Sequence, residues 1–325
     1  MNYRTPELTM RCVASLAGER NRLPRLRAVV VDGGSQDGSS AVLEKALGGD
    51  EFREWVTFIP LAVNGGFGWA NNQAILTLAR DPSPPDYVHV LNPDTEVAEG
   101  AVMSLVAELE KHGCCGAAGS QLLTDDGQEA ASAFRFPSSG REFVNAAQST
   151  KLARLLGIAP TVVGEPASSE ADWVSGASVM LRSAALREVG LFDDGFFLYF
   201  EEVELMHRLR SAGWTVRHVP QSRIVHAEGF ATGVRRDASR PMPRYWYESR
   251  RRYFMLTRGR RAALTADFAS LAGRALGIAK QIVRRYSDRG IRTGKLLQPS
   301  FGRVKPSVPA WGDAPGAPPA WMARR

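Results

Sequence analysis

Strand-like apolar runs alternate with helical stretches through the first two thirds of this 325-residue chain. The runs are residues 27–32 (RAVVVD), 56–61, 87–91 and 115–122, and residues 6–16, 39–47, 69–79 and 101–112 between them carry apolar side chains at helical spacing. Such alternation predicts an α/β fold, in which helices cover a mostly parallel sheet. A hydrophobic content of 44% excludes a chain that is disordered throughout.

The chain changes character after these elements. Residues 124–171 are polar and interrupted by Gly and Pro, which is typical of an irregular excursion over a sheet. Residues 261–285 carry apolar side chains at helical spacing among basic residues, and residues 298–325 hold six Pro. We therefore expect an α/β domain at 1–234, a basic helical extension at 235–297 and a disordered tail at 298–325.

Charge is distributed unevenly along the chain. Residues 235–325 hold 21 Lys and Arg against 5 Asp and Glu, whereas residues 1–234 hold 20 against 29. No zinc-finger, RNP-type or basic-zipper pattern accompanies the basic region, so we expect no nucleic acid partner. We favour contact of the amphipathic basic helix with an inner membrane surface. RNA binding and a solvated helix that packs on the domain stay open as alternatives.

The cysteines indicate the compartment. Cys12, Cys114 and Cys115 fit neither a disulfide framework nor a CxxC metal site. The N-terminal residues lack the apolar core of a signal peptide, and no run of about 18 uncharged apolar residues predicts a spanning helix. We expect a cytoplasmic protein, peripheral at the inner face of the plasma membrane.

Two glycine-rich turns follow the first strand-like runs. Asp32 precedes GGSQDG, at the edge where open α/β sheets bind ligands. The glycines of NGGFG, including Gly66, permit close approach of a ligand to the backbone, and Asn71 lies near the start of the next helix. Neither turn has GxGxxG spacing, and ordinary strand-to-helix turns are the alternative for both.

The run YVHVL leads into Asn92-Pro93-Asp94. Two short oxygen-bearing side chains that flank one residue can bind a hard cation, and Mg²⁺ or Mn²⁺ on a diphosphate needs only one or two protein ligands. An Asx turn is the alternative reading of this segment. His226 ends a later apolar run, where it either completes such a site or is a structural histidine.

Three carboxylates follow the apolar segment FFLYF. Burial at an apolar edge and mutual repulsion would raise a carboxyl pKa there, which suits a general base. Compensation of the helix dipole and an ion pair between Glu204 and Arg208 are the alternative explanation. We favour a functional role for Glu201 and Glu202 but not for Glu204.

Seven segments, taken in order, resemble the family 2 glycosyltransferases, particularly bacterial rhamnosyltransferase-like members of cell-surface polysaccharide pathways. They are NYRTPE, VVVDGGSQDGS, NGGFGWANN, LNPDTEV, WVSGASVMLR, GLFDDGFFLYFEEVELMHRLRSAGW and VHAEG, over roughly residues 1–230. The resemblance implies a GT-A fold and inverting transfer of a sugar from a nucleoside-diphosphate sugar to a lipid-linked or polysaccharide acceptor. A rhamnose donor fits the same resemblance.

The resemblance also implies roles for single residues. Nucleotide-sugar contacts would come from Tyr3, Asp32, Gly66, Asn71 and Asn92. Asp94 and His226 would bind Mg²⁺ or Mn²⁺. Glu202 would take the proton of the acceptor hydroxyl, and Trp173 and Gly176 would line the acceptor side.

The chain departs from the family pattern in two places. The family usually reads EDVDL where this chain reads EEVEL, which moves a carboxylate by about one methylene and can cost ~10²-fold in rate or reassign the base to Glu201. The family's first strand should precede Asn2, so we expect that strand to be missing and the true start to lie upstream, with a shortened inactive protein as the alternative.

Two other classes of function bear on the same residues. A nucleotidyltransferase would need a glycine-rich basic signature near the N-terminus, which this sequence lacks. A catalytically degenerate family member that binds nucleotide or glycan as a scaffold stays open.

Overall fold

The computed structural model describes residues 1–163, 170–227 and 242–293, with side chains up to residue 283. The tail expected at 298–325 lies outside these residues. The chain divides into two compact units, Met1–Ile278 and Ala279–Arg325. In chain order the elements are α1 (Pro6–Ala17), the 3₁₀ turn η1 (Gly18–Asn21), β1 (Ala28–Asp32), α2 (Ser39–Leu47), β2 (Val56–Pro60), α3 (Phe67–Ala79), β3 (Tyr87–Leu91), β4 (Thr95–Val97), α4 (Ala101–Lys111), β5 (Cys115–Leu123), β6 (Ala133–Phe134), α5 (Ser139–Ala146), α6 (Thr150–Leu155), β7 (Glu170–Ala171), β8 (Trp173–Val174), β9 (Ser178–Arg182), α7 (Ser183–Val189), α8 (Glu201–Ser211), β10 (Thr215–His226) and α9 (Arg244–Thr293).

The strands form a mixed sheet, which corrects the expectation of a mostly parallel one while keeping the α/β class. The larger sheet has the order β3-β9-β5-β10-β4, with β7 also paired to β10. Only β5 and β10 run parallel in it; the β3–β9, β5–β9, β4–β10 and β7–β10 ladders are antiparallel. Apolar runs look alike in either direction, so the reversal of β9 between β3 and β5 left no signal in the sequence.

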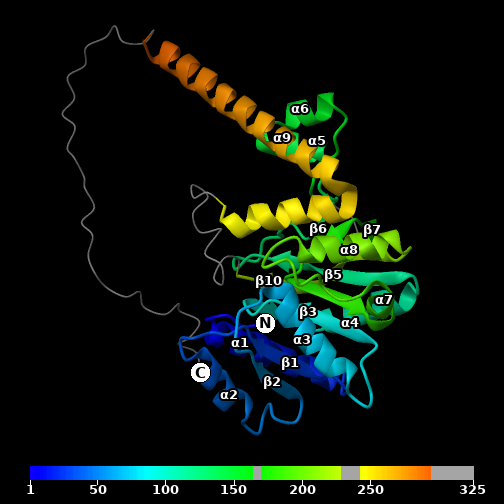
Figure 1. Cartoon of the computed structure of the whole chain (residues 1–325). Coiled ribbons are helices and arrows are strands. Elements are labelled where there is room, and N and C mark those ends of the chain that lie inside the picture. Colours follow the sequence, from blue (N-terminus) through cyan, green and yellow to red (C-terminus); the bar gives the residue numbers. More distant parts are fainter. Residues whose placement is uncertain (164–169, 228–241, 294–325) are drawn as a thin grey trace, which may run out of the picture. The chain divides into compact units, whose positions relative to one another are not determined.

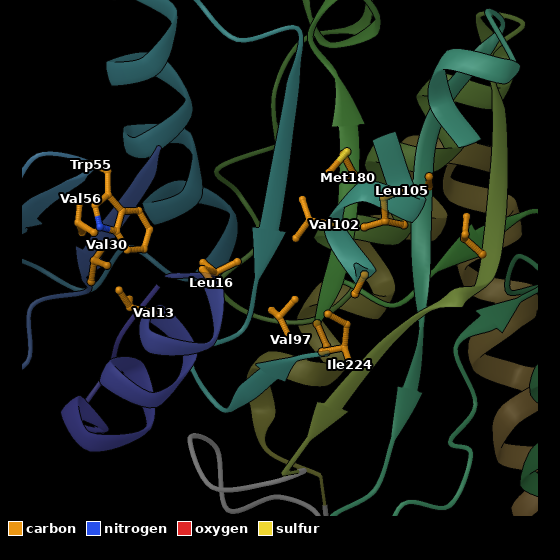
Figure 2. Packing of buried hydrophobic residues seen from close by; sticks show 14 of the residues in the cluster. Val13, Leu16, Val30, Trp55, Val56, Val97, Val102, Leu105, Met180 and Ile224 are labelled. Carbon is orange, nitrogen blue, oxygen red and sulfur yellow. The ribbon is translucent and has the colours of Figure 1, made fainter. Parts of the chain in front are cut away.

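The parallel pair β1–β2 is a separate sheet. Beside β1 stands a single bridged residue, Asn2, whose backbone N–H donates to the Val31 oxygen (2.7 Å) and whose oxygen accepts from Gly33 (2.9 Å). Among the described residues no strand joins β1 to β3. One apolar cluster nevertheless spans both sheets, and Figure 2 shows Leu16 of α1 between the group around Trp55 and the group around Ile224.

The helices form where apolar spacing and end signals agree. Pro6 occupies the first turn of α1, where its missing N–H costs nothing, and Leu105 and Leu109 of α4 are fully buried. Burying one such leucine contributes about 2 kcal/mol. Helix α9 bends at Gly259 (φ 81°, ψ 172°), where Figure 1 shows the yellow segment turning into the orange one. We call residues 244–258 the first segment of α9 and residues 260–293 its second segment.

The second segment of α9 packs on α5 through a glycine. A methyl group at Gly273 would lie 2.3 Å from the Phe143 backbone oxygen and 2.9 Å from the Ala146 side chain. The two helix backbones therefore approach closely, which explains a glycine inside a helix despite its low helix propensity. Leu264, Phe268 and Leu271 on the same segment are 53%, 74% and 66% exposed. No helix in the described part of the chain is long and apolar enough to cross a membrane.

Candidate active site

Strand register brings Asn92, Asp94 and His226 together. In the β10–β4 ladder His226 pairs with Thr95, so its ring lies next to Asp94, with 3.3 Å between Nε2 and the Asp94 Oδ1 oxygen. Asn92 Nδ2 lies 3.2 Å from the same ring nitrogen. Asp94 is only 7% exposed. Its Oδ1 and the His226 Nδ1 are buried without a hydrogen-bond partner in the described structure, and buried polar atoms of this kind call for a ligand or a water.

Glu201 and Glu202 open α8 as a second acidic site. Glu201 is 3% exposed, and burial first and the charge of Glu202 second raise its pKa well above the ordinary value. Glu202 is half-buried, and burial raises its pKa to about 7. The Oε2 atom of each has no hydrogen-bond partner among the described residues. The two neighbouring carboxyl groups therefore both have raised pKa values, because burial disfavours their charged forms.

Gly176 stands against Glu202 and joins the two acidic sites. A methyl group at Gly176 would lie 3.5 Å from the Cβ and Cγ atoms of Glu202, an ordinary van der Waals distance, so Gly176 packs directly beside this side chain. The next residue, Ala177, accepts a backbone hydrogen bond from Asn92 (2.9 Å), which extends the β3–β9 ladder by one rung. Asn92, two residues before Asp94, is thus paired with the residue that follows Gly176.

Glycines also join the two turns after β1 and β2 to the loop before α8. A methyl group at Gly34 would lie 2.7 Å from the Val63 carbonyl carbon. One at Gly66 would lie 2.1 Å from the Phe197 oxygen, which already accepts the Phe67 N–H at 2.9 Å. Glycine at these two positions therefore lets the turn after β1 approach the turn after β2, and lets the latter approach the loop before α8.

Asp32 ends β1 inside the protein. It is 1% exposed, and its carboxylate accepts from the Asn2 side chain (2.6 Å) and from the Ser35 backbone N–H (2.9 Å). The sequence motifs indicated Tyr3 in this region, whereas the residue that holds Asp32 is Asn2. Nucleotide contact by Tyr3 and Asp32 stays a prediction, because the structure contains no ligand.

Two further predicted residues take part in packing. Asn71 lies in the first turns of α3 and donates to the Phe67 oxygen (2.9 Å), while its neighbour Asn72 donates to Asp194 (2.7 Å) in the loop before α8. Trp173 stacks on Phe134 with ring centroids 4.2 Å apart and packs against an apolar cluster to which both α8 and α9 contribute. Their ligand contacts stay predictions as well.

The loop before α8 has an unusual backbone. Tyr199 and Phe200 both have φ of 69°, the left-handed region that bulky residues avoid at a cost of about 1–2 kcal/mol each. The first segment of α9 holds this loop: Ser249 donates to the Leu198 oxygen (2.9 Å), and Tyr253 packs 5.8 Å from the Phe200 ring. Local sequence patterns could not predict this contact, because it joins residues some fifty positions apart.

Residues 87–277 match the model of the glycosyl transferase family group 2, and residues 2–150 match that of glycosyl transferase family 2. The first match covers more than half of the chain and contains both acidic sites. The chain is a family 2 glycosyltransferase. The resemblance found in the motifs is therefore confirmed.

Two relatives of this glycosyltransferase are rhamnosyltransferases. It is 29% identical over 231 residues to the N-acetylglucosaminyl-diphospho-decaprenol L-rhamnosyltransferase of Mycobacterium tuberculosis, covering 67% of this chain and 71% of the relative. It is 26% identical over 168 residues to the rhamnosyltransferase WbbL of Escherichia coli K12, covering 50% of this chain and 60% of the relative.

Solved structures confirm the GT-A fold of this glycosyltransferase. It is similar to S. aureus TarS 1-349 in complex with UDP-GlcNAc (TM-score 0.52, 14% identity, 83% of this chain and 68% of the other). It is also similar to GalNAc-T7 with UDP, GalNAc and Mn²⁺ (TM-score 0.50, 16% identity, 68% of this chain), of whose length it spans 41%. At these identities the likeness concerns the fold alone.

Proposed function

We propose that this glycosyltransferase moves a sugar from a nucleoside diphosphate to an acceptor hydroxyl by single displacement, with Glu202 as the general base. The observation that carries the proposal is the contrast between the two acids. Glu202 is half-buried, faces Gly176 and has a pKa near 7, so it is partly ionised and able to accept a proton at neutral pH. Burial and the charge of Glu202 raise the pKa of the buried Glu201 carboxyl well above its ordinary value, which disfavours two negative charges on the pair.

The proton and the electrons balance in one step. Glu202 accepts the hydroxyl proton as the acceptor oxygen forms a bond to the anomeric carbon of the donor sugar. The bond between that carbon and the diphosphate oxygen breaks, and the nucleoside diphosphate leaves with the electron pair. Displacement from one face inverts the anomeric configuration, whereas attack by Glu202 on the sugar itself would lead to retention. The configuration of the product, read by NMR, therefore tests the role of Glu202.

Asp94 and His226 are the residues that would hold Mg²⁺ or Mn²⁺. The residues fit such a cation, because Asp94 presents a buried carboxylate oxygen without a hydrogen-bond partner in the described structure. The part of the chain that the structure describes contains no cluster of three or more acidic, His or Cys ligands. Diphosphate oxygens and water would supply the other ligands, and the bound cation would neutralise charge on the departing diphosphate.

The relatives suggest the donor and the acceptor. Both are named rhamnosyltransferases, and one name specifies a diphospho-decaprenol lipid. We therefore infer a rhamnose donor and a lipid-linked acceptor in cell-surface glycan synthesis. The exposed apolar side chains of α9 lie in the basic part of the chain, which suits peripheral binding to anionic lipid at the cytoplasmic face.

The donor site is tested by thermal unfolding with a panel of nucleoside diphosphates and nucleotide sugars, with and without Mn²⁺. We expect one nucleotide to raise the unfolding temperature only with the cation, and Asp94→Asn to abolish the increase. Asp86→Asn is the matched control, because this exposed residue precedes β3 while Asp94 follows it. A nucleotide response that survives in Asp94→Asn would exclude the proposed cation ligand. Absence of any response would favour a catalytically degenerate family member that binds glycan as a scaffold.

A further inference from the structure

A hollow lies beside the loop before α8. It has a volume of about 240 Å³ and lies between the loop before α8 and the first segment of α9. Its lining residues are Gly195, Phe197, Tyr245, Glu248, Ser249 and Arg252. None of them belongs to the residues that the sequence motifs connect with donor, cation or acceptor. Sites for drug-sized ligands occupy about 300–1,000 Å³, so this volume suits one small ring.

The walls of the hollow are held in place from both sides. Arg252 donates two hydrogen bonds to the Asp193 carboxylate (2.7 and 2.9 Å), and its guanidinium fills the space over Gly195. Ser249 donates to the Leu198 oxygen (2.9 Å). A preformed hollow spares a ligand the entropic cost of ordering its own site.

The chemistry of the lining favours a neutral, amphipathic ring. The Phe197 side chain is 43% exposed, and its ring lies 5.6 Å from that of Tyr245. Of the charged lining residues, Arg252 is paired with Asp193 and Glu248 is paired with Arg244, each at 2.7 Å. An anionic phosphate would therefore compete with carboxylates already present. A sugar ring, with a C–H face for the aromatic rings and hydroxyl groups for Glu248, fits both features.

Phe197 belongs both to the lining of the hollow and to the loop that leads into Glu201 and Glu202. The Phe197 ring lines the hollow, while the Phe197 carbonyl accepts from Phe67 on the donor-side turn. The chain then passes through Tyr199, whose ring stacks near that of Tyr245 (6.1 Å, 23° between planes), and reaches Glu201 and Glu202. A ligand in the hollow would thus lie on the segment that presents the proposed base.

From this arrangement we infer that the hollow binds a sugar unit of the acceptor, separate from the sugar that is transferred. That this sugar belongs to the acceptor rests on the proposed function. That the ligand is a sugar rests on the lining of the hollow alone. Tyr245 and Glu248 are its specificity residues, the first through its ring face and the second through hydrogen bonds to hydroxyl groups.

Saturation-transfer NMR on the full chain, with a panel of free monosaccharides that includes N-acetylglucosamine, galactose and rhamnose, tests the inference. We expect at least one sugar to bind, Tyr245→Ala to weaken its affinity about 3- to 10-fold, and Glu248→Gln to weaken it about 10-fold. Glu248 is 58% exposed in its side chain, so Glu248→Gln keeps the test valid if Tyr245→Ala disturbs the loop. Tyr247→Ala is the matched control: this tyrosine is 38% exposed on the same helix and does not line the hollow.

The outcomes separate this inference from the proposed function. Sugar binding that falls in both hollow variants and persists in Tyr247→Ala supports the site. No sugar binding to the wild-type chain, or equal binding by all four proteins, overturns it. Nucleotide binding by the same wild-type sample is measured independently. Sugar binding without nucleotide binding would support the sugar site in the hollow and contradict the proposed glycosyl transfer.

Discussion

Replacing Glu202 with Gln removes an ionisable group from a place that disfavours its charge. Burial raises the Glu202 pKa from its ordinary 4.5 to about 7 in the folded protein. Ionising a group with that difference costs about 3 kcal/mol of folding free energy, at about 1.4 kcal/mol per unit of pKa. The substitution also relieves Glu201, because the charge of Glu202 is the second cause of its raised pKa. Glu202→Gln should therefore be more stable than the wild type at pH 8 by about 3 kcal/mol.

The size of the effect depends on pH. The folded protein holds the Glu202 proton more tightly than the unfolded chain does, so the stability present below pH 4.5 is lost as the pH rises through about 7. At pH 4.5 and below, wild type and Glu202→Gln should unfold at nearly equal urea concentrations. The difference between them should grow between pH 4.5 and 7 and then level off.

Urea unfolding at pH 5 and pH 8, together with the pH profile of sugar transfer, measures both consequences. Wild-type kcat should rise with pH through a midpoint near 7, and Glu202→Gln should lose about 10²–10⁴-fold in kcat. Glu44→Gln is the control, because the same charge is removed from an exposed position on α2. Equal pH dependence of unfolding in Glu202→Gln and wild type would refute the burial argument, and retained kcat would refute the role as base.

Three further substitutions test the packing around the site. Gly66→Ala would place a methyl group 2.1 Å from a backbone oxygen of the loop before α8 at a φ of 96°, so we expect at least ~10²-fold lower kcat and a lower urea midpoint. Gly273→Ala should destabilise by about 1–3 kcal/mol in urea unfolding because it pushes α5 from α9, whereas Gly18→Ala, with open space and φ of −62°, should not destabilise. Phe268→Glu should reduce flotation with anionic liposomes severalfold, while Leu155→Glu, at an 81% exposed position, should not.

Local patterns predicted most elements and the residues at strand ends. The run YVHVL became β3, SSAVLEKAL became α2, and the ion pair considered for Glu204 and Arg208 forms with a 2.8 Å contact. The position of His226 beside Asp94 follows from the β10–β4 register, which depends on where two distant strands stop. Periodicity shows which side chains are buried but not which strand lies beside which, so the mixed sheet and the separate β1–β2 pair could not be predicted.

The basic C-terminal region makes contacts beside the site that sequence patterns could not predict. Its composition predicted a helix with an apolar stripe and a domain boundary at residue 234, and that boundary stays a prediction. In the structure the first segment of α9 contacts the loop that begins α8 through Ser249, Arg252 and Tyr253. Two bulky residues in left-handed backbone before Glu201 cost about 2–4 kcal/mol together, and such strain persists only where surrounding contacts fix it. The position of the proposed base therefore depends on a helix some fifty residues downstream, so shortening the chain before α9 would remove contacts that hold Glu202 in place.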